Sequence, residues 1–157
     1  MSAGGLKIGE PQQIYFIAAA VVVIGLTILG FFLREGMATS NTFNQGVALY
    51  EHKDYKAAEE AFRQVISRHP SNDGVHLLLG DVLMQQDKKE EAIAQFKEVI
   101  RRAPKNVDAH LRVGAALVKQ DKLEEGIAAL EKARDLLKAQ RNPKKAEQVD
   151  QLLKQIS

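Results

Sequence analysis

The chain has 157 residues, of which 45% are hydrophobic and 27% are charged, and its formal net charge is +2. So small a charge argues against a nucleic-acid surface, and the low aromatic content without tryptophan argues against base-stacking platforms. The lack of cysteine excludes disulfides, thiol chemistry and cysteine-ligated metals.

The first predicted element is a membrane anchor at residues 14–33, which follows a short polar tail at residues 1–13. The stretch IYFIAAAVVVIGLTILGFFL carries no charge over 20 positions. As a helix it would span about 30 Å, the thickness of the hydrocarbon core of a bilayer. The alternatives are a buried soluble helix and a signal peptide cleaved near Ala38-Thr39-Ser40. Because the apolar part of a signal peptide runs about 7–15 residues, we expect a retained single-pass anchor in contact with membrane lipid.

The orientation of this anchor is weakly encoded, because basic residues flank it almost equally. Lys7 and the amino terminus precede it, while Arg34 and Lys53 follow it. We expect the tail to lie in the cytosol and the rest of the chain on the periplasmic side of a bacterial inner membrane. The cytoplasmic side and an organelle membrane also fit the sequence. The anchor has no acidic or basic residue that could relay a proton, so we interpret it as a passive tether.

After a short linker at residues 34–38, the sequence repeats itself with a period of 34 residues. The stretch YKAAEEAFRQVISRHPSN from Tyr55 is similar to KEEAIAQFKEVIRRAPKN from Lys89, and a looser copy starts at Leu123. A fixed period of this kind is the signature of stacked repeat units. Three classes of position recur at this step. Small residues recur at Gly46, Gly80 and Gly114 and at Ala58, Ala92 and Gly126. Large apolar residues recur at Phe62, Phe96 and Leu130, and prolines at Pro70 and Pro104.

Each unit is predicted to be a pair of helices joined by a polar turn. In the second unit, two apolar stripes at three- and four-residue spacing flank the turn at residues 86–88. The first stripe holds Val75, Leu78, Leu79, Val82 and Leu83, and the second holds Ala92, Ile93, Phe96, Val99 and Ile100. Gly80 and Ala92 are small where the helices would cross, and Phe96 can fill the space between pairs. One pair cannot bury both of its faces, so neighbouring pairs are expected to stack.

This pattern resembles the tetratricopeptide repeat family over residues 39–140, as three units at 39–72, 73–106 and 107–140. The resemblance implies an all-α solenoid of helical hairpins. The chain departs from the family pattern at several places: Thr42, His76 and His110 stand at the tryptophan position, and Gly126, Leu130 and Lys138 replace alanine, phenylalanine and proline in the third unit. Without that proline, the last repeat helix is expected to run on to about Gln140.

A capping helix is predicted at residues 141–157. Asn142 is a favourable N-cap, and Pro143 suits a first helical turn. An apolar stripe follows, made of Ala146, Val149, Leu152, Leu153 and Ile156. A terminal helix of this kind covers the open face of the last repeat; the alternative is a helix that binds a partner.

Nothing in the sequence predicts catalysis, a cofactor, a metal site or a small-molecule substrate. The four histidines (His52, His69, His76 and His110) fall in repeat positions, without the spacing of metal ligands. We interpret them as packing residues. Phosphate-loop and nucleophile motifs are absent. Paired glutamates at 59–60, 90–91 and 124–125 are predicted to lie in the first turn of each second helix, where they complement the helix dipole.

The family resemblance also implies a concave groove lined by the first helix of each unit. The implied lining residues are Phe43, Val47 and Tyr50 in unit one, Leu77, Asp81 and Met84 in unit two, and Leu111, Ala115 and Val118 in unit three. Relatives that clamp the acidic tails of heat-shock chaperones use Lys, Asn and Arg residues on this face. Of those positions only Arg112 fits, since Phe43, Val47, Leu78 and Asp108 occupy the rest. The groove is therefore expected to be largely apolar, without that clamp.

Two functions remain open from the sequence. In the first, the protein is a membrane-tethered scaffold or adaptor whose groove takes a partner helix or peptide, in the assembly or stabilisation of a membrane protein complex. In the second, it is a permanent accessory subunit, with anchor and solenoid both packed on other chains. Small residues on one face of the anchor would favour the second. Ala18–Ala20, Gly25, Thr27 and Gly30 do not form one stripe. Both functions imply protein partners and no nucleic acid.

Overall fold

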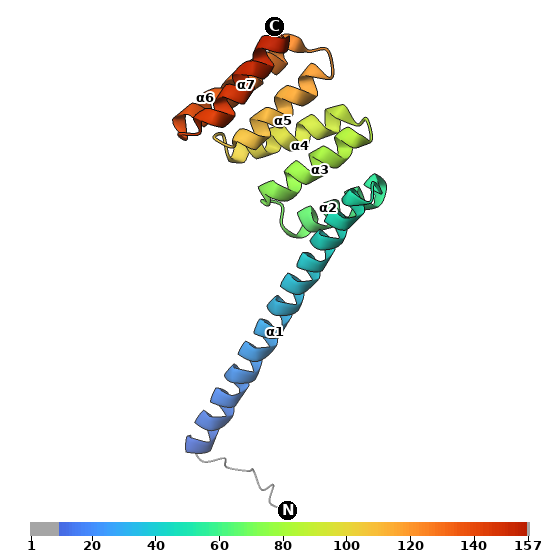
Figure 1. Cartoon of the computed structure of the whole chain (residues 1–157). Coiled ribbons are helices and arrows are strands. Elements are labelled where there is room, and N and C mark those ends of the chain that lie inside the picture. The colour runs from blue at the N-terminus through green and yellow to red at the C-terminus, as the bar shows by residue number, and fades with distance from the viewer. Residues whose placement is uncertain (1–9, 157) are drawn as a thin grey trace, which may run out of the picture. The chain divides into compact units, whose positions relative to one another are not determined.

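The computed structural model describes residues 10–156, apart from the side chains at 10–14, 16 and 35. Those residues are all-helical, without a strand (Figure 1). The elements are α1 (Glu10–Glu51), α2 (Tyr55–Arg68), α3 (Asp73–Gln85), α4 (Lys89–Arg102), α5 (Val107–Val118), α6 (Leu123–Ala139) and α7 (Pro143–Ile156). The chain divides into two compact units, Met1–Asn41 and Thr42–Ser157. Most of the predicted polar tail, at residues 1–9, lies outside the described residues.

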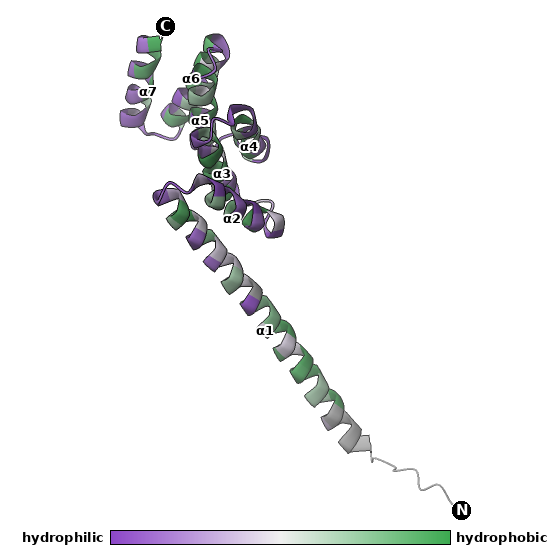
Figure 2. Ribbon diagram, turned by 90° about the vertical axis from the view of Figure 1, so that its right-hand side faces the viewer, coloured by the Kyte–Doolittle hydropathy of each residue, from purple (hydrophilic) through white to green (hydrophobic). Residues whose placement is uncertain are grey.

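The first unit contains the apolar part of α1. By length and composition alone, α1 is the one helix among the described residues that could cross a membrane, and nothing in the structure covers its apolar stretch. The described large apolar side chains between Tyr15 and Met37 are 52–76% exposed. Figure 2 shows this hydrophobic run, whereas polar and apolar residues alternate along α2 to α7.

The predicted linker at residues 34–38 is wrong as a break between elements, because these residues lie within α1. Their sequence, REGMA, contains helix-favouring Arg, Met and Ala. A single glycine costs only about 1 kcal/mol in a helix. An added Cβ at Gly36 would meet nothing within 4 Å, so this glycine serves no close contact. The first helix of the first repeat is therefore the C-terminal end of α1.

The second unit is a stack of helical hairpins in which each helix from α2 to α7 contacts the next (Figure 1). The turn inside each repeat hairpin contains one residue in the left-handed region. These residues are Lys53, Asp87 and Asp121, with φ values of 62°, 60° and 59°. The helix that follows each hairpin starts at an asparagine N-cap: the side chains of Asn72 and Asn106 accept hydrogen bonds from the backbone N–H three residues on, at 3.2 and 3.0 Å. The turns thus repeat with the same 34-residue period as the core.

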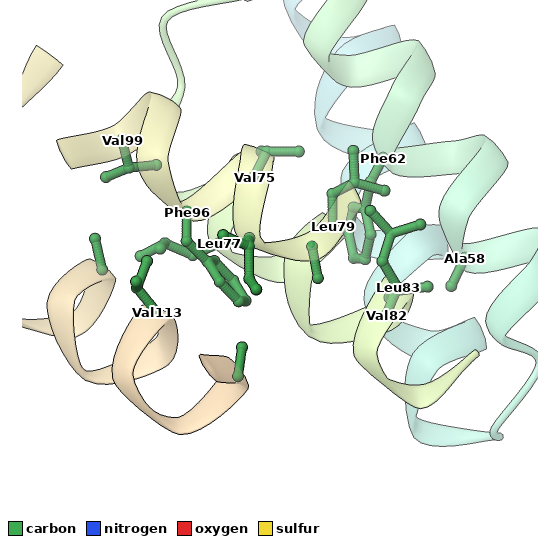
Figure 3. Close-up of a cluster of buried hydrophobic side chains, with 14 of the residues drawn as sticks. Ala58, Phe62, Val75, Leu77, Leu79, Val82, Leu83, Phe96, Val99 and Val113 are labelled. Atoms are coloured by element: carbon green, nitrogen blue, oxygen red, sulfur yellow. The ribbon is translucent and has the colours of Figure 1, made fainter. Parts of the chain in front are cut away.

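Three glycines allow the two helices of each hairpin to approach closely, as the sequence predicts for Gly80. A Cβ added at Gly46 would lie 2.8 Å from Cε1 of Phe62, and one at Gly114 would lie 2.6 Å from Cγ of Leu130. At Gly80 it would overlap the ring of Phe96. Phe62, Phe96 and Leu130 are all at most 1% exposed. Figure 3 shows Phe62 and Phe96 within the cluster of buried side chains that runs through the repeats.

The C-terminal helix α7 covers the last repeat, as expected. Its residues Ala146, Val149 and Leu153 are buried in a second core cluster with Leu130 and Leu137 of α6. The side chain of Asn142 caps α7 by accepting a hydrogen bond from the backbone N–H of Lys145, at 3.3 Å. The last repeat helix ends at Ala139, with Gln140 as its C-cap. Of the predicted stripe, Leu152 is the exception, because it remains 40% exposed.

Of the four histidines predicted to be packing residues, His76 and His110 are buried, whereas the prediction is wrong for His52 and His69, which are exposed. His76 and His110 are 6% and 9% exposed. In each, Nε2 lies 2.9 Å from the carbonyl oxygen of the preceding proline, Pro70 or Pro104. These contacts join the start of one unit to the end of the unit before it.

The prediction for the first pair of glutamates is wrong. No acidic residue lies in the first turn of α2, whereas Glu90-Glu91 and Glu124-Glu125 do lie in the first turns of α4 and α6. Glu59 falls a turn later, in register with Ile93 of the second repeat. It is 9% exposed and faces the next hairpin, so its role is a contact between repeats.

Candidate functional site

The candidate site is a shallow hollow of about 150 Å³ on the first helices of the repeats. Five of the ten residues implied by the resemblance surround it: Tyr50 of α1, Asp81 and Met84 of α3, and Arg112 and Ala115 of α5. Gln85, Phe96 and Lys119 complete the lining. The hairpin geometry explains this gathering, because a 34-residue step places the first helices of successive units side by side.

An ion pair between neighbouring repeats crosses the floor of this hollow. Nε of Arg112 lies 2.9 Å from Oδ1 and 3.0 Å from Oδ2 of Asp81. Both side chains are about one-third exposed or less. Burial lowers the pKa of Arg112, but the hydrogen bond and charge of Asp81 outweigh it, so the pKa is raised. The opposite charges of Arg112 and Asp81 are therefore in direct contact and largely cancel each other.

Tyr50 adds a neutral phenol to the same hollow. Burial raises its pKa, and the negative charge of Asp81 and the neighbouring Tyr55 raise it further, against the opposing effect of Arg112. The rings of Tyr50 and Tyr55 lie 5.8 Å apart in a tilted arrangement. At neutral pH the hydroxyl of Tyr50 keeps its proton and can donate a hydrogen bond to a bound segment.

This pairing changes the interpretation of Arg112. In the sequence, Arg112 is the one residue that fits a clamp for acidic tails. In the structure, its guanidinium already binds a carboxylate of its own chain. A carboxylate from outside would have to displace Asp81 and leave that acid unpaired, which is unfavourable for a partly buried charge. The Asp81–Arg112 pair is thus locally neutral, and the exposed Lys119 is a further cation in the lining of the hollow.

The other implied groove residues lie elsewhere. Leu77 is 9% exposed and belongs to the buried cluster, because α3 is an interior helix with neighbours on both sides. Phe43 and Val47 are partly buried against the same cluster, and the ring of Phe43 lies 6.2 Å from that of Phe62. A Cβ added at Gly126 would lie 2.7 Å from Cγ2 of Val118, so this valine packs against α6.

Leu111 lines a second hollow, of about 280 Å³, between the third repeat and α7. Its other lining residues are Leu137, Lys145, Gln148, Val149 and Leu152. The sequence interpretation favoured a cap over a partner-binding helix for α7 and did not place this helix beside Leu111. The signal was available: a further step of 34 from Leu111, Ala115 and Val118 leads to Lys145, Val149 and Leu152. The helix α7 thus stands where the first helix of a fourth unit would stand.

Among residues 10–156, no group of three histidine or acidic side chains could hold a metal ion. The buried histidines lie against backbone carbonyls. At the hollow, Arg112 and Asp81 form an ion pair with each other. The hollow presents apolar surface, the phenol of Tyr50, the Asp81–Arg112 ion pair and the ammonium of Lys119.

Comparison with solved structures supports the same fold. The TPR2B domain of yeast Sti1, in a complex with pHsp70, is similar with a TM-score of 0.70 and 22% identity, over 76% of this chain and 96% of that one. The chaperone SycD of Yersinia enterocolitica, in complex with a peptide of the translocator YopD, has a TM-score of 0.68 and 16% identity, over 74% and 90%. MamA of Desulfovibrio magneticus has a TM-score of 0.59 and 23% identity, over 75% of each chain.

Sequence comparison identifies the family directly. Curated proteins give no significant match to this chain. The family description that does match is the tetratricopeptide repeat, over residues 43–106 and 77–145. These two overlapping segments extend from Phe43 to Lys145, which is more than half of the 157 residues. They cover the hairpins, the hollow that contains Asp81 and Arg112, and the start of α7. The chain belongs to the tetratricopeptide repeat family.

Proposed function

We propose that this protein is a membrane-tethered scaffold that binds a partner helix or extended segment across the hollow formed by Tyr50, Asp81, Met84, Arg112 and Ala115. The observation that carries this proposal is the hollow itself, whose lining combines apolar groups, the internally paired Asp81 and Arg112, and the exposed Lys119. Such a surface suits apolar side chains from another chain. The role we assign is assembly or stabilisation of a membrane protein complex.

Family membership and the solved neighbours support binding as the general role. Two of the similar structures are complexes, one of a Sti1 domain with pHsp70 and one of SycD with a translocator peptide. We extend from them only the use of a helical-repeat surface to bind a polypeptide. Arg112 is already paired with Asp81, so the exposed Lys119 is the cation of the lining that remains available to a partner. We therefore expect a partner segment that is uncharged where it meets Arg112.

The tether is proposed to be residues 14–33. This part of α1 is uncharged, and its large side chains have no protein cover in the structure. Exposed apolar surface on this scale is unfavourable in water, at about 25 cal/mol per Å², and a bilayer would remove it. We assign the anchor to a bacterial inner membrane and the repeats to the periplasmic side, as the sequence analysis expects.

A photoreactive side chain placed at Ala115 tests the groove. Ala115 is exposed within the hollow, and Ala94, exposed on the outer helix α4, is the matched control. With p-benzoylphenylalanine at either position of the full chain in native membranes, illumination should yield a covalent product at 115 and none at 94. The same product at both positions, or at neither, would overturn the assignment of the hollow.

The same experiment separates a scaffold from a permanent subunit. A fixed subunit would give one product in proportion to the chain itself, whereas an adaptor would give several products in variable yield. With the photoreactive residue moved to Met84, another lining residue of the hollow, Ala115→Glu should remove those products and Ala94→Glu should retain them, while the helical circular dichroism stays unchanged in both.

Alkaline carbonate extraction of membranes, with mass measurement of the mature chain, tests the tether. The intact chain should stay in the membrane pellet; a soluble product that begins near Asn41 would identify a cleaved signal sequence. Because the chain lacks cysteine, the single variant Ala94→Cys reports the side of the membrane. A maleimide that cannot cross the inner membrane should label it in spheroplasts, and labelling only after lysis would place the repeats in the cytoplasm.

A further inference from the structure

Two exposed leucines stand out in the unit Thr42–Ser157. Outside α1, the large apolar side chains that are exposed among the described residues are Leu123, at 46%, and Leu152, at 40%. Single exposed leucines are ordinary. These two differ from the ordinary case because opposite charges surround them.

Leu123 is surrounded by acids. Asp121 precedes it in the turn, and Glu124 and Glu125 follow it in the first turn of α6. We call Asp121, Leu123, Glu124 and Glu125 the acidic knob; with Lys122, the single basic residue among them, they border an open hollow of about 470 Å³. Within the described chain, no ion pair or side-chain hydrogen bond engages Glu124 or Glu125.

The corresponding acids one repeat earlier are engaged. Oε1 of Glu90 accepts a hydrogen bond from Gln120 at 2.9 Å. Oε2 of Glu91 accepts one from Arg63, also at 2.9 Å. The place of Leu123 is taken there by Lys89, whose ammonium lies 3.1 Å from Asp87. The acidic knob is therefore a specific feature of the third repeat.

Leu152 lies on the rim of the hollow between the third repeat and α7, which we call the basic hollow. Leu111, Leu137 and Val149 supply its apolar lining, and Lys145 lies at its edge. Arg141 and Lys144, in the turn and first turn before Lys145, are exposed. Over residues 10–156, no side-chain ion pair engages these three cations. The rim thus carries positive charge next to an apolar cavity.

We propose that two copies of this chain associate by docking the acidic knob of one into the basic hollow of the other. Leu123 fills the space lined by Leu111, Val149 and Leu152, while Glu124 and Glu125 face Lys144 and Lys145. Charge complementarity identifies a second copy as the occupant, because the chain itself carries both halves of the contact. If the same two copies make both contacts, knob to hollow in each direction, they form a closed two-fold dimer. If each copy contacts two different neighbours, the assembly continues as an open chain. This surface is distinct from the hollow of the proposed function.

Charge reversal in separate copies tests the proposal with the full chain in a mild detergent. Variant A carries Glu124→Lys and Glu125→Lys, and variant B carries Lys144→Glu and Lys145→Glu. Two differently tagged preparations are mixed at low salt, and the retention of one on resin specific for the other is measured. Wild type should be retained, while A with A and B with B should each fall by about tenfold or more, since like charges then face each other.

Mixing A with B provides the decisive result. The knob of A then meets the hollow of B with reversed signs, and the knob of B meets the unchanged hollow of A. Retention should return to the wild-type level and weaken with added salt. Leu123→Ser removes the apolar contact and leaves the charges of the knob and the hollow unchanged, so it should weaken retention.

Glu51→Lys with Glu60→Lys is the matched control, because both residues are exposed and the change in charge equals that of A. It should behave as wild type, and circular dichroism should show that all variants are folded. Three outcomes would each overturn the proposal: wild-type copies that do not retain each other, A or B alone retaining like wild type, or a mixture of A and B that does not recover. A loss of crosslinking at Ala115 in the earlier experiment would leave this result unchanged, so the two proposals can fail separately.

Discussion

The two junctions between repeats use different chemistry at the same position. At the first junction Glu59 is 9% exposed, and at the second Ile93, one period later, is 8% exposed. Glu59 accepts hydrogen bonds of 2.8 Å each from Arg63, Gln86 and Lys88. Ile93 belongs to the apolar cluster. An ionised carboxylate and an aliphatic side chain thus fill equivalent sites at equal depth.

This difference teaches that the period encodes backbone geometry and leaves the chemistry of a junction free. A buried carboxylate is acceptable only when its hydrogen bonds are satisfied, and the first junction meets that condition with partners from the following hairpin. The second junction needs no such partners, since its contacts are apolar. The first should therefore respond to pH and the second should not.

The largest effect is expected from the apolar cluster at the second junction. Truncating a buried aromatic ring costs about 3–5 kcal/mol, so Phe96→Ala should lower the free energy of unfolding by that amount. Guanidinium titration of the full chain in detergent, followed by circular dichroism, measures it. The neighbouring exposed residue gives the control, since Lys97→Ala should change stability by less than about 0.5 kcal/mol. Equal losses for the two would show that the core assignment is wrong.

A smaller loss is expected where the paired helices approach most closely. In Gly80→Ala the new methyl group overlaps the ring of Phe96, and overpacking of this kind costs about 1–3 kcal/mol. Gly74 is the contrasting case. An added Cβ there meets only Oδ1 of Asn72, at 3.5 Å, so Gly74→Ala should stabilise α3 by about 0.5–1 kcal/mol. The same titration should show a lower free energy of unfolding for Gly80→Ala and a higher one for Gly74→Ala. A change in the same direction for both would contradict the packing described above.

The polar junction should lose stability in acid. Burial raises the pKa of Glu59, but hydrogen bonds from Lys88, Arg63 and Gln86 outweigh it and lower the pKa from 4.5 to about 2. Because the folded pKa is the lower one, this stabilisation is complete above pH 4.5 and is lost as the pH falls through about 2. Glu59→Gln should cost about 1–2 kcal/mol at pH 7, allowing for the exposed lysine and arginine partners.

The difference between Glu59→Gln and wild type should shrink when the titration is repeated at pH 3. Ile93→Val provides the comparison at the second junction. Ile93→Val should lower the free energy of unfolding by about 0.5–1.5 kcal/mol. This loss should be the same at pH 7 and pH 3. A pH-independent loss for Glu59→Gln would mean that its hydrogen bonds do not depend on its charge.

The smallest effect is expected in the turn of the first hairpin. Lys53 adopts φ 62°, a region that costs a non-glycine residue about 1–2 kcal/mol. Glycine removes this strain but loses more chain entropy on folding, so Lys53→Gly should stabilise by about 0.5–1 kcal/mol net. A thermal melt of the variant should show a higher midpoint, and a lower one would indicate an unrecognised contact of the lysine.

The repeats could be predicted because their geometry requires particular residues at fixed steps. Gly80 and Phe96 are in contact because only a glycine lets that ring lie between the helices. The continuity of α1 through residues 34–38 was not predictable from composition, since a segment with one glycine reads equally well as a linker or as a helix. The sequence could not show that Leu77 is buried while Met84 lines a hollow, because both are apolar residues on one helix.

The pairing of Asp81 with Arg112 also escaped the sequence analysis. The two residues are 31 positions apart, and their contact depends on how the first helices of adjacent units align. A comparison of positions within the repeat shows which family roles a residue fits. It does not show which charges neutralise one another across two units, and that requires coordinates.

The position of α7 has a consequence for how this architecture can vary in length. Since Lys145, Val149 and Leu152 occupy the register of Leu111, Ala115 and Val118, the closing helix has the same docking geometry as any first helix. A 34-residue block inserted ahead of Arg141 would then present to α7 the surface that the third repeat presents now. Because each hairpin contacts only its neighbours, stability should grow by one nearest-neighbour increment per block. The number of repeats between α1 and α7 would then set the length of the surface formed by the first helices, and α7 could close a stack of any length.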